Sequence, residues 1–448
     1  MEEYIKTLLG QVRCKKAHVL IEDEIRGHME EQTEANIAAG MSREEAVKAA
    51  VNDMGDAVEA GIALDRVHRP GMAWDMVILM AVISIAGVVI HILAGNNIYG
   101  DAGFALYTVI GFVSMLVVYR IDYSFLAQYS KALAACMIGF AVLALISGGT
   151  INGMVTYLPY GDYRVSVFSV LMLYIPVYGA VLYQYYGTGK TGIIKAVLWL
   201  IAPVILALGF PNFVLAVVLF FSMAVVLSYA VYRGWFQISK KHFMLVFWGS
   251  IIVLPVVLLT GMFAFHWFSE YHEARVRGFF DRNRDINYIA NFLQDCLVDF
   301  RFVGGDGISG QSLPDAGSSH ILIYLMASYG IVAGLLVCGI LLFLSIRIFK
   351  ISVRQKNQLG MMMGCGCGMA FVSNIVLNLL ENTGFFPPAA TFLPFFSSGG
   401  GNMLISYILV GIIMSVYRYK NVFPEHFKIT ENRFIKKTVP ACRLSDKI

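Results

Sequence analysis

About ten long apolar segments constrain this chain more than any other feature of its sequence. A helix needs about twenty consecutive apolar residues to cross a bilayer. Only 14% of the residues are charged, against about 25% in soluble domains. The sequence therefore predicts an all-α integral membrane protein with about ten transmembrane helices. The predicted spans are 72–93, 103–119, 130–146, 165–183, 192–208, 213–232, 243–265, 321–347, 360–381 and 403–417.

The first seventy residues form a polar unit ahead of the apolar segments. Ser42 and Glu45 have the spacing of a capping box, and Gly40 and Gly55 are stop signals for helices. This pattern predicts a small cytoplasmic three-helix domain over residues 1–70. The unit resembles the helical prefix found ahead of some bacterial permeases and sensor-linked membrane proteins. An assembly adaptor and a ligand-sensing domain both remain open. The membrane domain is predicted over 71–420 and a basic tail over 421–448.

The basic residues between the apolar segments predict the orientation in the membrane. Lysine and arginine recur in alternate short loops, and such loops face the cytoplasm. The residues concerned are Arg120, Lys131, Lys190, Lys195, Arg233, Lys240, Lys241, Arg347, Lys350, Arg354 and Lys356. An even number of spans then places both termini in the cytoplasm of a plasma membrane. One large external loop remains, at 266–320.

The large loop carries several arginines, among them Arg275 and Arg277. A basic segment at the outer leaflet suits an anionic lipid headgroup or a pyrophosphate, and a simply solvated loop is the alternative. The stretch "GTGKTG" at 187–192 looks like part of a phosphate-binding loop, but apolar segments flank it on both sides. We therefore predict no nucleotide and no nucleic acid as partners. No metal site can be read from the spacing of the metal-ligating residue types.

Between the last two spans lies the stretch "GFFPPAATFLPFFSSGGG". Proline and glycine at this density exclude a regular helix or strand, and irregular backbone at membrane depth is tolerated where it is buried in protein or lines a cavity. The segment resembles the last external loop of the SEDS family, the FtsW, RodA and SpoVE lineage of bacterial cell shape and division. The matching residues are Asn378, Gly384, Pro387, Leu393, Pro394, Phe395, Ser397, Gly399 and Gly400.

The resemblance implies a function in peptidoglycan biosynthesis. SEDS proteins polymerise a lipid-linked disaccharide carried on undecaprenyl pyrophosphate, and they work beside a transpeptidase partner. Such glycosyl transfer implies no certain cofactor, although a divalent cation could bridge the pyrophosphate. By resemblance, the residues that bind substrate would be Arg275, Arg277, Asn378, Pro394, Ser397, Gly399 and Gly400.

The catalytic residues are where the sequence departs from the family. The family's essential acid lies in a Leu-Pro-Glu-Ala-x-Thr-Asp-Phe motif, and Ser319 stands at the aspartate position. A neutral hydroxyl cannot act as that base unaided, so Asp315 and His320 are the substitute candidates. The alternative for His320 is a polar cap on the eighth span. Further charged positions of the family are neutral here, among them Ser169 and Met172.

Whether the chain is an enzyme is therefore left open by its sequence. The first hypothesis is a divergent peptidoglycan glycosyltransferase that engages the precursor at the outer leaflet. The second is a non-catalytic regulator or scaffold of wall synthesis. The third is a transporter of the lipid-linked precursor.

Overall fold

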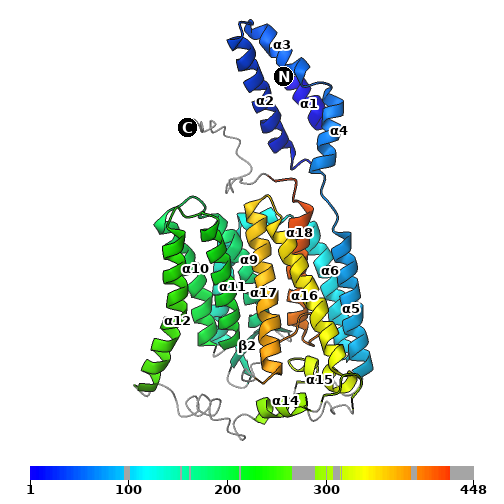
Figure 1. Ribbon diagram of the computed structural model, residues 1–448, viewed down its shortest axis with the longest axis vertical. Helices are drawn as coiled ribbons and strands as arrows, with labels where there is room; N and C mark the ends of the chain where they lie inside the picture. Colours follow the sequence, from blue (N-terminus) through cyan, green and yellow to red (C-terminus); the bar gives the residue numbers. More distant parts are fainter. Residues whose placement is uncertain are drawn as a thin grey trace.

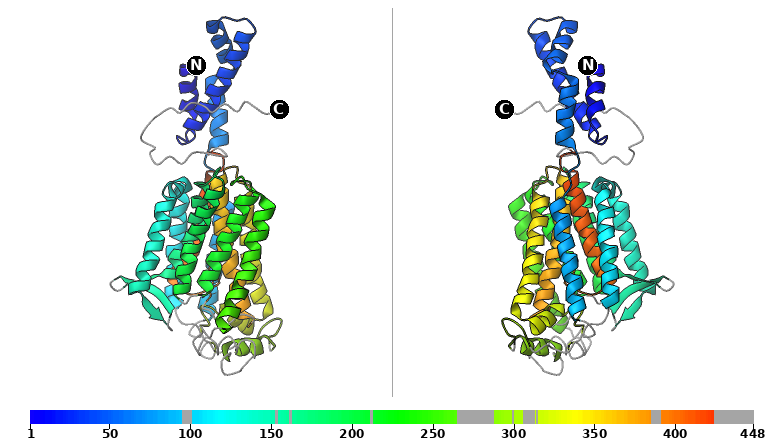
Figure 2. Two further views of the ribbon diagram at one scale, coloured as in Figure 1. Left: turned by 90° about the vertical axis from the view of Figure 1, so that its left-hand side faces the viewer. Right: turned by 90° about the vertical axis from the view of Figure 1, so that its right-hand side faces the viewer.

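A helical prefix stands on one end of a bundle of long helices in the computed structural model (Figures 1 and 2). We call the end of the bundle beside the prefix the prefix end, and the opposite end the distal end. The C-terminal end of α18 lies at the prefix end, whereas α14 and α15 lie at the distal end. The structure describes residues 1–94, 101–151, 154–160, 163–210, 213–264, 288–298, 300–305, 313, 315–384 and 391–423.

Four helices form the prefix, one more than predicted. They are α1 (Glu2–Gln11), α2 (His18–Ala38), α3 (Arg43–Asp53) and α4 (Ala57–His68). The helix missed by the prediction is α1, which is short and buries Ile5 and Leu8. Its stability depends on packing against α4, where a Cβ atom on Gly61 would lie 2.5 Å from Leu8 O. The predicted capping box of Ser42 and Glu45 is confirmed at the start of α3.

Asp122 joins the prefix to the membrane domain. Its carboxylate accepts a 2.7 Å ion-pair hydrogen bond from Lys16 Nζ of the prefix, and the Asp122 side chain is only 7% exposed. The same carboxylate caps the short helix α7 (Tyr123–Gln128) by accepting the Ser124 N–H and hydroxyl. One side chain therefore fixes both the start of α7 and a contact to the prefix.

Replacing Asp122 by alanine is expected to destabilise the protein by about 1–2 kcal/mol, because the helix cap and its buried partners lose their acceptor. Thermal unfolding in detergent measures the effect. Lys16→Ala is the matched control, and it should cost less than about 1 kcal/mol because Lys16 is 43% exposed. Equal losses from the two variants would contradict this account of Asp122.

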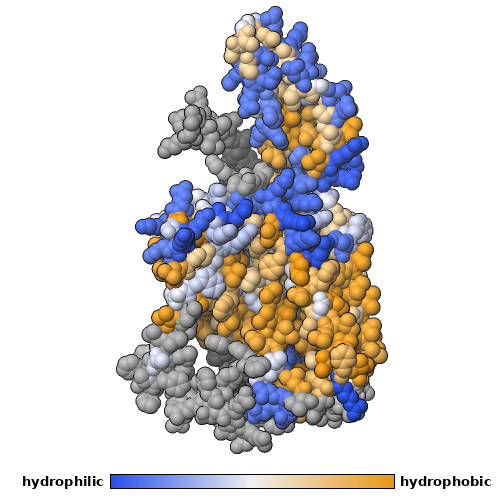
Figure 3. All heavy atoms as spheres, viewed as in Figure 1, coloured by the Kyte–Doolittle hydropathy of each residue, from blue (hydrophilic) through white to orange (hydrophobic). Residues whose placement is uncertain are grey.

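Nine of the ten predicted spans each coincide with one helix, and the tenth, 321–347, corresponds to two. The membrane helices are α5 (Trp74–Ala94), α6 (Asp101–Arg120), α8 (Ser130–Ser147), α9 (Val167–Tyr183), α10 (Lys190–Gly209), α11 (Phe213–Tyr232), α12 (Lys240–Ala264), α16 (Ile331–Val353), α17 (Gln358–Asn382) and α18 (Gly400–Arg418). Within the described ranges, eight of the chain's helices are long and apolar enough to cross a membrane, and α9 is a shorter apolar helix. On the face shown in Figure 3, hydrophobic side chains cover much of the bundle, and hydrophilic ones gather at the prefix end. The chain is an all-α, multi-pass membrane protein.

The predicted span 321–347 is interrupted rather than continuous. Its first turns form the separate helix α15 (Ile321–Tyr329), which ends at Gly330 with a φ of 93°. A Cβ atom at Gly330 would lie 2.7 Å from Phe302 O, and the Ile331 N–H donates to Arg301 O. The helix therefore breaks where residues 301–305 pack against it.

A small antiparallel sheet at the distal end was not predicted. Its strands β1 (Gly149–Ile151), β2 (Met154–Tyr160) and β3 (Tyr163–Ser166) pair in chain order. The sheet projects from the side of the bundle (Figure 2). It occupies residues that the prediction left as a loop, except that the span expected from 165 begins as α9 at Val167. The side chain of Ser166 caps α9.

The helix α17 runs through the middle of the bundle and positions the residues discussed below (Figure 1). Small residues allow its neighbours to approach closely. A Cβ atom on Gly179 of α9 would lie 2.8 Å from Met362 O, and one on Gly366 would lie 3.0 Å from Ile175 O. The central position of α17 buries its polar C-terminal turn inside the distal end of the bundle.

Candidate functional site

The segment between α17 and α18 is irregular but tightly held, as the sequence predicted for residues near Pro394. The Leu393 N–H donates to Ser397 Oγ at 2.7 Å, and the Ser397 N–H donates back to Leu393 O at 3.0 Å. Phe395 has a φ of 68°. Residues 391–397 are all buried. We call this segment the 391–397 turn.

Helix α5 fixes the 391–397 turn from the side. His91 Nε2 lies 2.8 Å from Phe396 O, and the imidazole stacks on Phe104 with ring centroids 3.7 Å apart. Gly87 lies one helical turn earlier, where a Cβ atom would come within 2.8 Å of Phe395 O. The backbone of the 391–397 turn therefore packs directly against helix α5, with no side chain between them.

A second turn, over residues 315–320, lies against the first. The Ser318 and His320 N–H groups both donate to Asp315 O, at 2.9 and 3.2 Å. The two turns are joined by Ser397 Oγ, which donates to Ser318 O at 2.6 Å, and by Ser398 N–H, which donates to Gly317 O at 2.7 Å. Two segments about eighty residues apart in sequence thus share one seam.

The last turn of α17 holds both segments through amide side chains. Asn378 Nδ2 and Asn382 Nδ2 each donate to Ser319 O at 2.9 Å. Asn378 Nδ2 also lies 3.0 Å from Thr391 Oγ1. The Oδ1 atoms of both asparagines are buried and have no hydrogen-bond partner in the part of the chain that the structure describes. Both asparagines therefore hold Ser319 O with their amide nitrogens and leave a buried oxygen acceptor unused.

Glu381 is the site residue that sequence reasoning missed. Its Oε2 accepts the Thr391 N–H at 3.1 Å and a short hydrogen bond from the Thr391 hydroxyl. Its Oε1 lies 3.8 Å from His320 Nε2, and the side chains of Glu381 and His320 are 1% and 3% exposed. The signal was present in the sequence, because an acid within an apolar span is rarely retained without a role. We call Ser319, His320, Asn378, Glu381, Thr391 and Ser397 the distal cluster.

The structure brings some of the predicted site residues together and leaves others apart. Ser319, His320, Asn378 and Ser397 lie together in the distal cluster, with Pro394 in the adjoining turn. The side chain of Asp315 is exposed, and its backbone carbonyl is what contacts His320.

The remaining predicted residues lie outside the distal cluster or outside the described residues. Gly399 precedes α18 and is exposed, and a Cβ atom on Gly400 would lie 2.5 Å from the Tyr107 ring. Arg275 and Arg277 lie outside the described residues. The structure thus gives the positions of the described residues, and the functional roles of all the predicted site residues stay predictions.

The two positions where charged residues of the family are replaced, Ser169 and Met172, lie outside the distal cluster. Ser169 Oγ approaches Asn402 Oδ1 at 3.5 Å, and Met172 is fully buried beside Asn374. Among the described residues, no group of three His, Cys, Asp or Glu side chains could hold a metal ion. The distal cluster is accordingly a place where one imidazole and one carboxylate meet within ion-pair distance.

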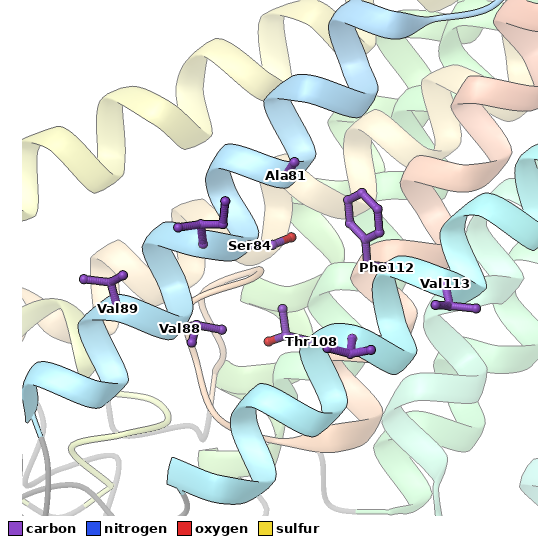
Figure 4. Close-up of a pocket in the computed structure, with 9 residues that line it drawn as sticks. Ala81, Ser84, Val88, Val89, Thr108, Phe112 and Val113 are labelled. Atoms are coloured by element: carbon purple, nitrogen blue, oxygen red, sulfur yellow. The ribbon is translucent and has the colours of Figure 1, made fainter.

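Two apolar grooves open on the sides of the bundle. One, of about 250 Å³, adjoins the 391–397 turn and is lined by residues of α5, α15 and α16 with Phe396. The other, of about 380 Å³, lies between α5 and α6, where Ser84, Val88, Thr108 and Phe112 line it (Figure 4). The hydroxyls of that second groove are engaged within the protein, since Ser84 Oγ lies 2.6 Å from Tyr407 OH. Both grooves therefore present hydrocarbon surface.

Comparisons with known proteins agree on one family. The FtsW/RodA/SpoVE cell cycle protein model matches residues 69–422. A probable peptidoglycan glycosyltransferase FtsW of Trichlorobacter lovleyi is 24% identical over 377 residues, covering 77% of this chain and 93% of that protein. A protein of the same name from Hydrogenovibrio crunogenus is 27% identical over 323 residues, covering 68% of this chain and 79% of that protein.

Solved structures share the fold. A chain from a study of how a peptidoglycan synthase complex coordinates polymerization and crosslinking aligns with a TM-score of 0.64 at 19% identity. It covers 78% of this chain and 98% of its own length. The rod shape determining protein RodA of Thermus thermophilus aligns with a TM-score of 0.55 at 18% identity over the same shares.

Proposed function

The chain belongs to the FtsW/RodA/SpoVE family of cell cycle proteins, and from this premise we propose that it is a divergent peptidoglycan glycosyltransferase. It would engage an undecaprenyl-pyrophosphate-linked precursor at the outer leaflet and extend a glycan chain. The relatives that cover most of this chain are named probable peptidoglycan glycosyltransferases. The observation that carries the proposal is the distal cluster, which joins His320 and a carboxylate on the segments that carry the sequence resemblance.

The orientation that this function needs is supported by the basic residues. Helix ends on the prefix side carry Arg120, Lys131, Lys190, Lys240 and Arg347. The positive-inside rule then assigns the prefix end to the cytoplasm and the distal cluster to the outer leaflet. A lipid-linked sugar on the outer leaflet would therefore meet the bundle at the cluster.

The chemistry follows from what glycosyl transfer requires. A sugar hydroxyl attacks the anomeric carbon of the lipid-linked glycan, the bond from that carbon to the pyrophosphate oxygen breaks, and the electron pair leaves with the pyrophosphate. A base must accept the hydroxyl proton. His320 and Asp315 are the candidate bases of the 315–320 turn. Arg275 and Arg277 are proposed to stabilise the leaving pyrophosphate.

The groove beside the 391–397 turn suits the polyprenyl chain of the precursor. Its lining is apolar, and Phe396 belongs to both the groove and the turn. A lipid tail in this groove would present its pyrophosphate near the turn.

Filling this groove is expected to weaken precursor binding by about tenfold or more, because a new side chain would take the volume of the lipid tail. Ala333→Trp places an indole among the lining residues. Leu335→Trp, at an exposed position on the same helix, is the matched control. Binding of a labelled lipid-linked disaccharide in detergent measures the effect. Equal affinity for the two variants would remove the groove from the proposal.

A non-catalytic role in regulating wall synthesis is the second candidate. Ser319 stands where the family has its acid, and His320 is 2% exposed. The same surfaces could then bind the precursor, or a transpeptidase partner, without turning the precursor over. A peptidoglycan synthase complex among the structural neighbours makes a transpeptidase the partner to test.

The deciding experiment is a polymerisation assay. Purified full-length protein is incubated with labelled lipid-linked disaccharide, alone and together with a candidate transpeptidase. Labelled glycan chains support the glycosyltransferase proposal. Binding of the precursor without any glycan chain under both conditions supports the regulatory role instead. Movement of the precursor across a vesicle membrane would favour a transporter.

A further inference from the structure

The carboxylate of Glu381 is buried at a depth where carboxylates are costly. Its side chain is 1% exposed, and burying an acid without partners costs several kcal/mol. Asp75, an acid of the membrane helix α5, is 51% exposed and pairs with Arg347 at the prefix end. Glu381 instead lies inside the distal end, on the last turn of the central helix α17.

The two oxygens of Glu381 have different neighbours. Oε2 is held by both donors of Thr391, the backbone N–H and the hydroxyl. Oε1 is directed at His320 Nε2, 3.8 Å away. Thr391 therefore fixes the carboxylate with its other oxygen within ion-pair distance of the imidazole. Pairs of this kind are commonly long before substrate binds and shorten in the reacting complex.

The pair of Glu381 and His320 lies close to Ser319, which stands where the family has its acid. Asn382, the next residue after Glu381, donates to Ser319 O, and His320 follows Ser319 in the chain. The carboxylate therefore lies beside the position where the sequence resemblance expects an acid, but it comes from α17 and reaches the site through His320.

We propose that Glu381 is a positioning residue for His320. Resting on the glycosyltransferase function proposed above, this assigns the base to His320 rather than to Asp315. The imidazole accepts the proton of the attacking sugar hydroxyl, and Glu381 Oε1 faces its Nε2. The carboxylate holds the ring in place and stabilises the imidazolium that forms. The proton remains on the imidazole until solvent takes it, and the electron pair of the broken bond leaves with the pyrophosphate.

The acceptor sugar must reach an imidazole that is closed to solvent in this structure. Among the described residues, the 315–320 and 391–397 turns meet through Ser397 Oγ to Ser318 O and Ser398 N–H to Gly317 O. The proposal therefore requires this seam to open before the acceptor sugar reaches His320. Glu381 from α17 is the charged group that faces His320 in the described part, and Asp315 contributes its backbone carbonyl.

The test is a double-mutant cycle on the full-length protein, with glycan formation from labelled lipid-linked disaccharide as the assay. Glu381→Gln should lower kcat by about 100-fold with little change in KM, and Glu381→Asp should restore part of the loss. In a His320→Gln background, Glu381→Gln should cost less than about twofold more, because residues that act as a unit are not additive. Asp295→Asn, an exposed amide substitution on α14, is the matched control.

The outcomes separate the two proposals. Two results would overturn the role of Glu381 and leave the glycosyltransferase proposal intact. One is a double variant whose fall in kcat is the product of the two single falls. The other is a Glu381→Gln variant as active as the wild type. A wild-type protein that binds the precursor but forms no glycan would overturn both. If Glu381→Gln lowers the folded yield, Thr391→Val is used instead, because this variant keeps the carboxylate but removes one of its hydrogen-bond donors. The same fall in kcat is expected. An unchanged kcat would count against the proposal.

Discussion

His320→Gln is expected to lower the rate of glycan formation by about 100- to 10,000-fold, the range that a general base contributes. Glutamine keeps a polar side chain of similar reach but cannot accept a proton at neutral pH. The precursor should still bind, because the apolar groove and the 391–397 turn are unchanged. The rate and the affinity are measured on the same preparation with labelled lipid-linked disaccharide.

The control for this variant is His242→Gln. His242 lies near the start of α12 at the prefix end, where the account places no chemistry. Its substitution should leave the rate within about twofold, the usual scale for a surface change. If His320→Gln retains the wild-type rate, the base of the reaction lies elsewhere, and Asp315 becomes the residue to substitute next.

Gly87→Leu is expected to abolish glycan formation by displacing the 391–397 turn. Even a Cβ atom at this position would lie 2.8 Å from Phe395 O, and the obstacle is backbone, which cannot rotate aside. Overpacking of this kind costs about 1–3 kcal/mol. The shift would also break the 2.8 Å contact between His91 and Phe396 O. Melting temperature and polymerisation rate should therefore both fall.

Gly139→Leu is the matched control for Gly87→Leu. Gly139 lies on α8, another membrane helix, and no atom lies within 4 Å of a Cβ atom built there. The added side chain should extend into lipid and leave both melting temperature and rate near the wild-type values. A Gly87→Leu protein that melts and works like Gly139→Leu would contradict the close contact between α5 and the turn.

Much of the fold could be predicted because apolar length is a local property. Nine of the ten predicted spans each coincide with one helix, since a membrane forces the backbone to satisfy its own hydrogen bonds. The break at Gly330 could not be predicted, because it depends on Phe302 O lying where a Cβ atom would go. The same holds for α1 of the prefix, whose Ile5 and Leu8 find their partners only in the folded unit.

The site was predictable in part for a related reason. Alignment with the family's motif shows which residue stands at each motif position. It therefore identified Ser319 in place of the acid, with His320 beside it. Glu381 stands on another helix, sixty-one residues after His320 by subtraction of their sequence numbers. Nothing local connects the two, and only the packing of the 315–320 turn against the end of α17 brings them within 3.8 Å.

The central claim is that the precursor is engaged at the distal end beside this cluster, and photo-crosslinking tests it most directly. A photoreactive phenylalanine analogue replaces Tyr329, which lines the groove next to the 391–397 turn, or Tyr232, which is 65% exposed at the prefix end of α11. Irradiation with labelled lipid-linked disaccharide should transfer label to the protein at position 329 and leave position 232 unlabelled. Label at position 232 alone, or at neither position, would contradict the account.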